Sequence, residues 1–106
     1  FVQGCASWTL DAAVAEGALP VPRYIKIDVD GFEHKVVAGA RTTLAGEGVE
    51  ELLIEVNPHL AEHRVMVEQL VGLGFRHNPG QARAASRPDG PFAGVGEWLF
   101  KREGAA

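Results

Sequence analysis

The stretch YIKIDVDGFE, residues 24–33, decides the fold of this chain. Its first six residues are rich in β-branched and aromatic side chains and follow a Pro-Val-Pro sequence, which predicts a strand over residues 24–29. Asp30 and Gly31 then predict a turn. From Phe32 onward the apolar residues recur at helical spacing, so the stretch indicates a strand, a tight turn and a helix in direct succession.

The next two elements extend this unit. Apolar residues spaced along one helical face predict a helix over residues 32–44, and Gly46 and Gly48 end it. Residues 52–56, LLIEV, are almost continuously apolar, which is typical of an interior parallel strand covered on both faces. A strand, a helix and a second strand in this order indicate a right-handed βαβ unit.

The remaining elements continue the alternation. Asn57 as N-cap and Pro58 at the first helical position predict a helix that ends at Leu73-Gly74. A short strand over 75–78, a loop over 79–94 and a last strand over 96–101 follow, and the long loop allows the last two strands to pair as an antiparallel hairpin. A short helix over residues 7–19, with Thr9 as N-cap, precedes the whole. We therefore expect one α/β domain in the order β-α-β-α-β-β after this first helix.

Acidic residues gather where the predicted strands end. Asp28, Asp30 and Glu33 follow the first strand, and Glu55 lies near the end of the second. In open α/β sheets, ligands bind beyond the carboxyl ends of the strands. A carboxylate there can act as general base, hydrogen-bond acceptor or metal ligand. The alternative is purely structural, with Asp30-Gly31 as a turn and Glu33 favoured by the helix dipole, and spacing alone leaves both open.

Several short motifs in a fixed order resemble the FkbM family of methyltransferases. They are Ser7-Trp8-Thr9-Leu10-Asp11, the stretch from Tyr24 to Glu33, Val37-x-Gly39-Ala40, Leu44, and Leu53-Ile54-Glu55-Val56. The family pattern is Lys-Ile-Asp-Val-Glu-Gly-x-Glu, so Asp30 stands where a longer glutamate is more usual. The resemblance covers residues 7–57, whereas residues 58–106 fit the architecture of the family more than its sequence.

The resemblance implies a Rossmann-like class I methyltransferase sheet of seven strands, of which this chain would supply strands four to seven. It also implies transfer of a methyl group from S-adenosylmethionine to a hydroxyl of a small molecule such as a sugar or another natural product. The expected catalytic residues are Asp28, Glu33 and Lys26, the expected cofactor-binding residues are Asp28 and Asp11, and the expected acceptor-binding residues are Asp30, Glu55 and His59. We assign no residue to a metal.

The sequence lacks two features that this class of fold needs for its cofactor. These are a glycine-rich turn after a first strand and an acidic residue about 20 positions further on that binds the ribose. The chain also starts without methionine. We therefore expect residues 1–106 to be the C-terminal part of a methyltransferase domain, belonging to an enzyme when complete and inactive alone.

Three alternatives stay open. Asp28-Val29-Asp30-Gly31 also resembles the nucleophile loop of haloacid-dehalogenase-type phosphatases, which hold magnesium, although no later acidic pair follows. His59 and His63, one helical turn apart, match an inverted zinc-protease pattern, with exposed histidines as the simpler interpretation. Finally, the chain can be a non-catalytic α/β interaction module whose strand over 24–29 is an unpaired edge that associates with a partner.

Composition excludes several other classes of function. The net charge is −4, and the lysines and arginines, Arg83 and Arg87 included, are scattered as solvated charges, so we expect no nucleic-acid partner. No apolar run approaches the ~20 residues that cross a bilayer, so we expect no membrane partner. Cys5 is the single cysteine, which fits a reducing compartment and a cytoplasmic location. The sequence does not indicate an oligomeric state.

Overall fold

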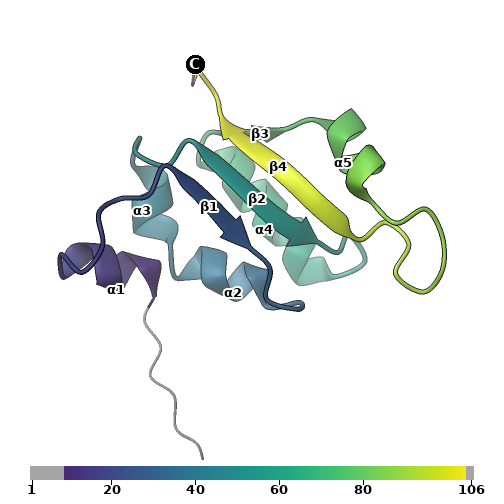
Figure 1. Ribbon diagram of the computed structural model, residues 1–106, viewed down its shortest axis with the longest axis horizontal. Coiled ribbons are helices and arrows are strands. Elements are labelled where there is room, and N and C mark those ends of the chain that lie inside the picture. Colours follow the sequence, from purple (N-terminus) through teal and green to yellow (C-terminus); the bar gives the residue numbers. More distant parts are fainter. Residues whose placement is uncertain (1–8, 105–106) are drawn as a thin grey trace, which may run out of the picture.

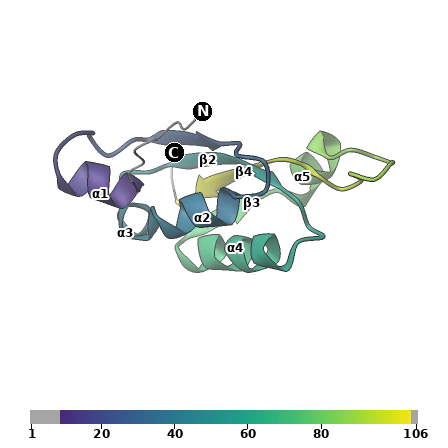
Figure 2. The ribbon, with the colours of Figure 1, turned by 90° about the horizontal axis from the view of Figure 1, so that it is seen from below.

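The computed structural model describes residues 9–104, which form a four-stranded sheet with helices packed mainly on one face (Figures 1 and 2). The strands are β1 (Tyr24–Ile27), β2 (Glu51–Val56), β3 (Phe75–His77) and β4 (Gly96–Arg102), in the spatial order β1-β2-β4-β3. β1 and β2 are parallel, and β4 is antiparallel to both β2 and β3. The predicted α/β class and the predicted pairing of the last two strands are therefore confirmed.

The helices are α1 (Leu10–Ala15), α2 (Glu33–Ala38), α3 (Arg41–Ala45), α4 (Ala61–Gly72) and α5 (Pro79–Ala85). Figure 2 shows α1 to α4 on the same side of the sheet, with α5 near one end of β4. Alternate residues of β2, namely Leu52, Ile54 and Val56, are buried beneath these helices, whereas Glu51, Leu53 and Glu55 are only partly buried. We expected both faces of this strand to be covered, and this expectation is wrong: within residues 9–104, only one face of β2 is fully buried.

The core lies between the sheet and its helices. Its largest fully buried side chains are Phe75, Phe100, Leu44, Leu52, Ile54, Met66 and Leu70. Trp98 packs partly buried beside them. At the end of the sheet where β2 begins, the Arg102 guanidinium donates hydrogen bonds to three backbone carbonyls, at 2.7 to 3.2 Å. That end is closed by the protein itself, whereas the opposite end carries the acidic residues.

The single helix expected over residues 32–44 is in fact two helices that meet at Gly39. Asp11, at the start of α1, accepts hydrogen bonds from the N–H of Thr42 (2.9 Å) and from the N–H and hydroxyl of Thr43 (both 2.7 Å). The Asp11 N–H in turn donates to the Gly39 carbonyl at 3.0 Å. A Cβ atom at Gly39 would lie 2.9 Å from Thr9 Cγ2, so glycine allows the close approach of α1 that divides the helix.

The first helix also differs in length from its prediction. Thr9 is its N-cap, as expected, because its hydroxyl accepts a hydrogen bond from the N–H of Ala12 at 3.1 Å. The helix ends at Ala15, before Gly17, whose φ of 74° favours glycine. The expected helix start at Ser7, and Cys5, lie outside the described residues.

The helix start expected at Asn57-Pro58 is wrong. The Asn57 side chain accepts the N–H of His59 at 3.0 Å and so closes a turn, and α4 begins only at Ala61. The Asn57 N–H points toward α4 and donates to Nδ1 of His63 at 2.9 Å. A hydrogen bond to a side chain of the following helix therefore holds this segment outside the helix.

The continuous loop expected over residues 79–94 is also wrong, because its first half is α5. Asn78 caps this helix by accepting the N–H of Gly80 (2.8 Å) and of Gln81 (3.1 Å), and Pro79 occupies the first helical turn. The chain thus contains two Asn-Pro pairs with the same helix-start signal. Only the second begins a helix.

Candidate functional site

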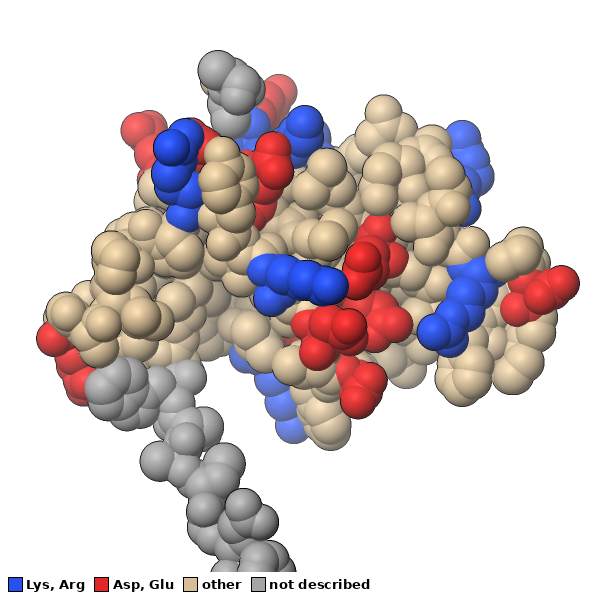
Figure 3. Space-filling view, in the orientation of Figure 1, with Lys and Arg blue, Asp and Glu red and all other residues tan. Residues whose placement is uncertain are grey.

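Three carboxylates meet at the carboxyl ends of the parallel strands. Asp28 and Asp30 follow β1, Glu55 lies near the end of β2, and one carboxylate oxygen from each lies within 4.8 Å of the other two. Figure 3 shows acidic side chains gathered over these strand ends, with basic side chains on either side. The structure therefore brings together the acidic residues that sequence reasoning placed at the two strand ends.

The electrostatics of this acidic group affect Glu55 most. Burial raises the pKa of the Glu55 carboxyl, and hydrogen bonding to Asp28 and the negative charges of Asp28 and Glu33 raise it further. The positive charge of Arg87 acts in the opposite direction. Glu55 is therefore the carboxyl of the group best suited to take up a proton.

This raised pKa predicts how stability responds to Glu55→Gln. Because the pKa of Glu55 is higher in the folded protein, proton binding at Glu55 favours the folded state. This contribution to the free energy of unfolding is fully present below the unfolded-state pKa and is lost as pH rises through the folded-state pKa. Removing the charge should stabilise the protein at pH 8, by about 0.5 kcal/mol since the site is partly exposed, and less at pH 4. Urea unfolding at both pH values measures the difference.

Glu51→Gln is the matched control for that experiment. Glu51 lies on the same face of the same strand but pairs with Lys101 at 3.8 Å, so its replacement should not stabilise the fold. A Glu55→Gln protein that is less stable than the parent at pH 8 would contradict the repulsion between Glu55 and its acidic neighbours.

The turn after β1 is shaped by a buried carboxylate, Glu33. Glu33 is 0% exposed and accepts hydrogen bonds from the N–H of Val29 (2.8 Å) and of Gly31 (2.9 Å). Between them, Asp30 has a positive φ of 52°, a conformation that is uncommon for residues other than glycine. Glu33 thus fixes the turn that presents Asp28 and Asp30. Its contacts fit a positioning role rather than the catalytic role that we expected.

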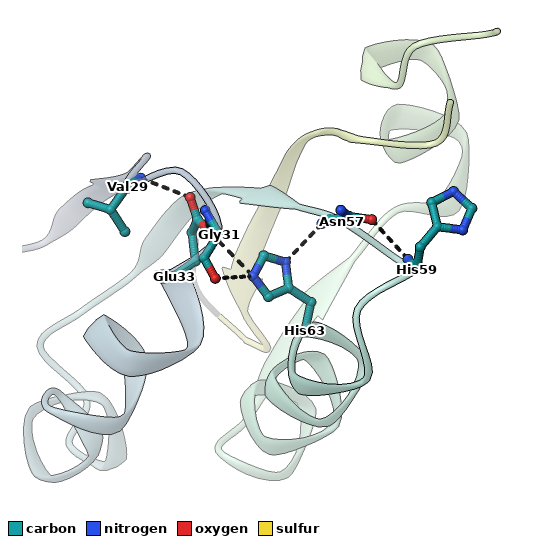
Figure 4. Close-up of polar contacts among 6 residues, drawn as sticks. All are labelled: Val29, Gly31, Glu33, Asn57, His59 and His63. Carbon is teal, nitrogen blue, oxygen red and sulfur yellow. Dashed lines mark hydrogen bonds and ion pairs between the residues drawn. The ribbon is translucent and has the colours of Figure 1, made fainter. Parts of the chain in front are cut away.

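His63 of α4 connects this turn to the turn after β2 (Figure 4). Its Nδ1 accepts the N–H of Asn57 at 2.9 Å, which makes Nε2 the nitrogen that carries the proton in the neutral ring. Nε2 lies 3.2 Å from the Gly31 carbonyl and 3.4 Å from Glu33 Oε1. One buried side chain therefore links the turn after β1 to the turn after β2.

A cleft of about 440 Å³ opens beside these turns. Its lining combines the two turns, the start of α4 and the loop before β4, and comprises Asp30, Gly31, Glu33, Glu55, Asn57, Leu60, His63, Arg87, Phe92 and Val95. Arg87 lies over the Phe92 ring, 5.4 Å from its centroid. The cleft thus has an acidic side near β1 and an aromatic and cationic side on the loop.

Four residues expected at the site do not line this cleft. Asp28 belongs to the acidic group but lines a hollow along β1 instead, and the other three make contacts elsewhere. Lys26 is exposed and lies 3.5 Å from Glu97 on β4. His59 is exposed, and its Nε2 lies 2.7 Å from the Ala93 carbonyl, so it holds the loop before β4. Asp11 caps α3, and although burial acts to raise its pKa, the hydrogen bonds from Thr43 and Thr42 outweigh this effect and lower it. These contacts give each residue a structural role in the described chain.

The contacts of His59 and His63 also argue against the zinc-protease interpretation. Both ring nitrogens of buried His63 are engaged within the protein, and His59 points away from it (Figure 4). The acidic group Asp28, Asp30 and Glu55 is instead the described set whose ligand atoms could surround one cation. Oxygen ligands of this kind suit Mg²⁺ or Ca²⁺.

Sequence reasoning missed three residues of the cleft. The sequence indicates His63 only as part of a histidine pair and Arg87 as a solvated loop charge, and it does not indicate Phe92. The available signal for His63 was its position one turn inside a helix that follows the acid-bearing strand β2. Nothing in the sequence signals that the loop before β4 folds back over the strand ends.

In comparisons with known proteins, the chain matches no family model, no curated protein and no solved structure. Within residues 9–104, no helix has the length and apolar character needed to cross a membrane.

Proposed function

We propose that this chain is the C-terminal part of an S-adenosylmethionine-dependent O-methyltransferase, and that its acidic cleft binds the hydroxyl to be methylated. The observation that carries the proposal is the meeting of Asp28, Asp30 and Glu55 at the ends of two parallel strands, together with the raised pKa of Glu55. Ligand sites of open α/β sheets lie at such strand ends. A carboxylate with a raised pKa is suited to accept the proton of a hydroxyl group.

The described residues supply the acceptor side of such a site and not a complete cofactor site. The N–H groups of Val29 and Gly31 are occupied by Glu33, so the turn after β1 has no free pair of amides for an anionic group. We assign Glu55, with Asp28 beside it, to proton acceptance, and Asp30 to the rim of the acceptor site. Binding of the cofactor is assigned to residues outside 9–104.

The arrangement of the sheet supports the same proposal. Two parallel strands followed by an antiparallel hairpin agree with the last four strands that the resemblance to the FkbM family implies. β1 forms the edge of the sheet, with no strand beyond it among the described residues (Figure 1). A cavity of about 700 Å³ runs along this edge, and its apolar lining includes Leu10, Ala13, Leu19, Ile25 and Val36. We assign this edge to the attachment of the remaining strands.

An exposed apolar edge predicts self-association of the 106-residue chain. Val36, 39% exposed in this cavity, tests the prediction through Val36→Glu, which places a charge where strands would associate. We expect oligomers of the parent chain at micromolar concentration and a shift toward monomer for the variant, measured by size-exclusion chromatography with light scattering. Val65→Glu, at a 51% exposed valine on α4, is the control and should not change the oligomers. A monomeric parent chain would contradict the edge assignment.

A magnesium-dependent phosphatase is the second candidate, because the acidic group could hold a divalent cation. One observation weighs against it. A phosphate at the β1 turn needs backbone N–H donors, and Glu33 already accepts those of Val29 and Gly31. An interaction module without activity is compatible with the open β1 edge, but it gives no reason for a group of acidic residues in which burial, and then the neighbouring Asp28 and Glu33, raise the pKa of Glu55.

The experiment that separates these functions uses a longer polypeptide in which this chain follows a segment that carries a glycine-rich strand–helix turn. We expect transfer of a labelled methyl group from S-adenosylmethionine to a member of a panel of sugars and other hydroxyl compounds. Glu55→Gln should lower kcat by about 10²- to 10⁴-fold, the usual contribution of a general base, and Glu51→Gln should leave it unchanged. Magnesium-dependent hydrolysis of p-nitrophenyl phosphate, lost in Asp28→Asn, would instead support the phosphatase.

A further inference from the structure

A second cavity lies between α5 and the turn that precedes α4, and Arg87 lines both this cavity and the acidic cleft. Its volume of about 440 Å³ falls within the usual range for small-molecule pockets, about 300–1,000 Å³. Among its lining residues are His77, Ala82, Arg83, Arg87 and Trp98. The lining contains two aromatic rings, three prolines and two arginines, and no carboxylate.

The walls of this cavity are fixed by hydrogen bonds. The Gln81 side chain joins α5 to β4, donating to the Glu97 carbonyl and accepting the Leu99 N–H, each at 3.0 Å. On the other side, His59 bonds to the Ala93 carbonyl at 2.7 Å. One wall is thus anchored to the sheet, and the other consists of the turn before α4 bonded to the loop before β4, an arrangement that reduces the entropic cost of binding.

The aromatic wall is suited to a flat ring. Trp98 and His77 stack with centroids 5.0 Å apart and an interplanar angle of 30°. Trp98 Nε1 and His77 Nδ1 are buried and have no hydrogen-bond partner among the described residues. Buried polar atoms usually have a partner, and of the three described side-chain nitrogens that lack one, two are on rings that line this cavity, whereas the third, His34 Nδ1, lies elsewhere.

The mouth of the cavity is cationic. Arg83 and Arg87 are exposed, and neither forms an ion pair with a described carboxylate, although the chain as a whole has a net charge of −4. A guanidinium group binds a carboxylate through two parallel hydrogen bonds. An anionic substituent at this mouth would therefore meet two available arginines and no opposing acid from the lining.

We propose that this cavity binds a flat aromatic carboxylate, with its ring against Trp98 and the prolines and its carboxylate at Arg83 and Arg87. The apolar walls supply the affinity for the ring, and the two arginines select the anion. The proposal does not rest on the proposed methyl transfer, because binding here requires neither the cofactor nor the acidic group, although Arg87 lines both cavities.

The test is a titration of 1-naphthoate into the 106-residue chain, followed through the Trp98 indole N–H signal by NMR. Trp8→Phe serves as the background, since it leaves Trp98 as the single indole. We expect saturable shifts of this signal with 1-naphthoate. The cationic analogue 1-naphthylmethylammonium should bind at least about tenfold more weakly, because it meets Arg83 and Arg87 as like charges.

Variants decide whether this cavity is the binding site. Arg83→Gln should weaken 1-naphthoate binding by about threefold or more, and Ala82→Leu, which fills the floor of the cavity, should abolish it, with folding verified by thermal melting. Arg41→Gln, at an exposed arginine of α3 outside the lining, is the control. Equal binding of both naphthyl compounds would overturn the proposal, as would binding that survives Ala82→Leu and Arg83→Gln, or no binding at millimolar ligand.

Discussion

Replacement of Glu33 by alanine should destabilise the protein by about 3–5 kcal/mol, a large part of the stability of a domain of this size. Glu33 is fully buried, accepts the N–H groups of Val29 and Gly31, and lies 3.4 Å from His63 Nε2. The variant would leave two backbone donors without their acceptor and a histidine without its neighbour. Thermal and urea unfolding measure the loss.

Glu62→Ala is the control for this experiment, because Glu62 is an exposed acidic residue in the first turn of α4. Its replacement should change stability by less than about 0.5 kcal/mol. His63→Ala should itself be costly, because Asn57 loses its acceptor, and the double variant should cost less than the sum of the two single variants. Additive effects would contradict the coupling of Glu33 to His63, and a Glu33→Ala protein as stable as the parent would contradict the role of Glu33 in the turn.

The second large effect concerns S-adenosylmethionine. The chain alone should show no binding at micromolar concentration, and the same residues placed after a segment with a glycine-rich strand–helix turn should bind with a Kd at least about 100-fold lower, or about 2.8 kcal/mol. The physical reason is that no glycine-rich turn connects a strand to a helix within residues 9–104. The turn between β1 and α2, which carries Asp28 and Asp30, does connect a strand to a helix, but its Val29 and Gly31 N–H groups already donate to Glu33.

A matched pair of variants tests whether this cofactor binding depends on attachment at β1. In the joined protein, Val36→Glu should weaken cofactor binding because it disturbs the edge cavity, whereas Val65→Glu on α4 should not. Glu55→Gln should leave cofactor binding within about twofold of the parent protein, since Glu55 is assigned to the acceptor. Equal losses in all three variants would indicate general destabilisation rather than attachment at this edge.

Much of the fold follows from the periodicity of apolar residues in the sequence. The wrong predictions occur where contacts between residues distant in sequence determine where a helix begins or ends. The strands and the α4 helix carry strong local patterns, and each was predicted to within a few residues. The break at Gly39 depends on Asp11, 28 positions earlier, and no local pattern reports such a contact. The two Asn-Pro pairs carry the same local signal, and only the hydrogen bond from Asn57 to His63 distinguishes the turn from the helix start.

The candidate site was predictable where it depends on topology and not where it depends on side-chain direction. Parallel strands place their carboxyl ends together, which is why Asp28, Asp30 and Glu55 meet as expected. Glu33 lies in the same motif, yet its side chain turns inward, because the two N–H groups of the turn bind it. Arg87 reaches the cleft through a loop whose course is set by contacts with β4 and His59, so sequence spacing carried no information about it.

A calorimetric titration of S-adenosylmethionine, first into the 106-residue chain and then into the chain joined to a preceding segment with a glycine-rich strand–helix turn, tests the assignment of the cofactor site. We expect no heat of binding for the chain alone and a micromolar Kd for the joined protein. Micromolar binding by the chain alone would contradict the assignment of the cofactor site to residues outside 9–104. No binding by the joined protein would contradict the methyltransferase itself.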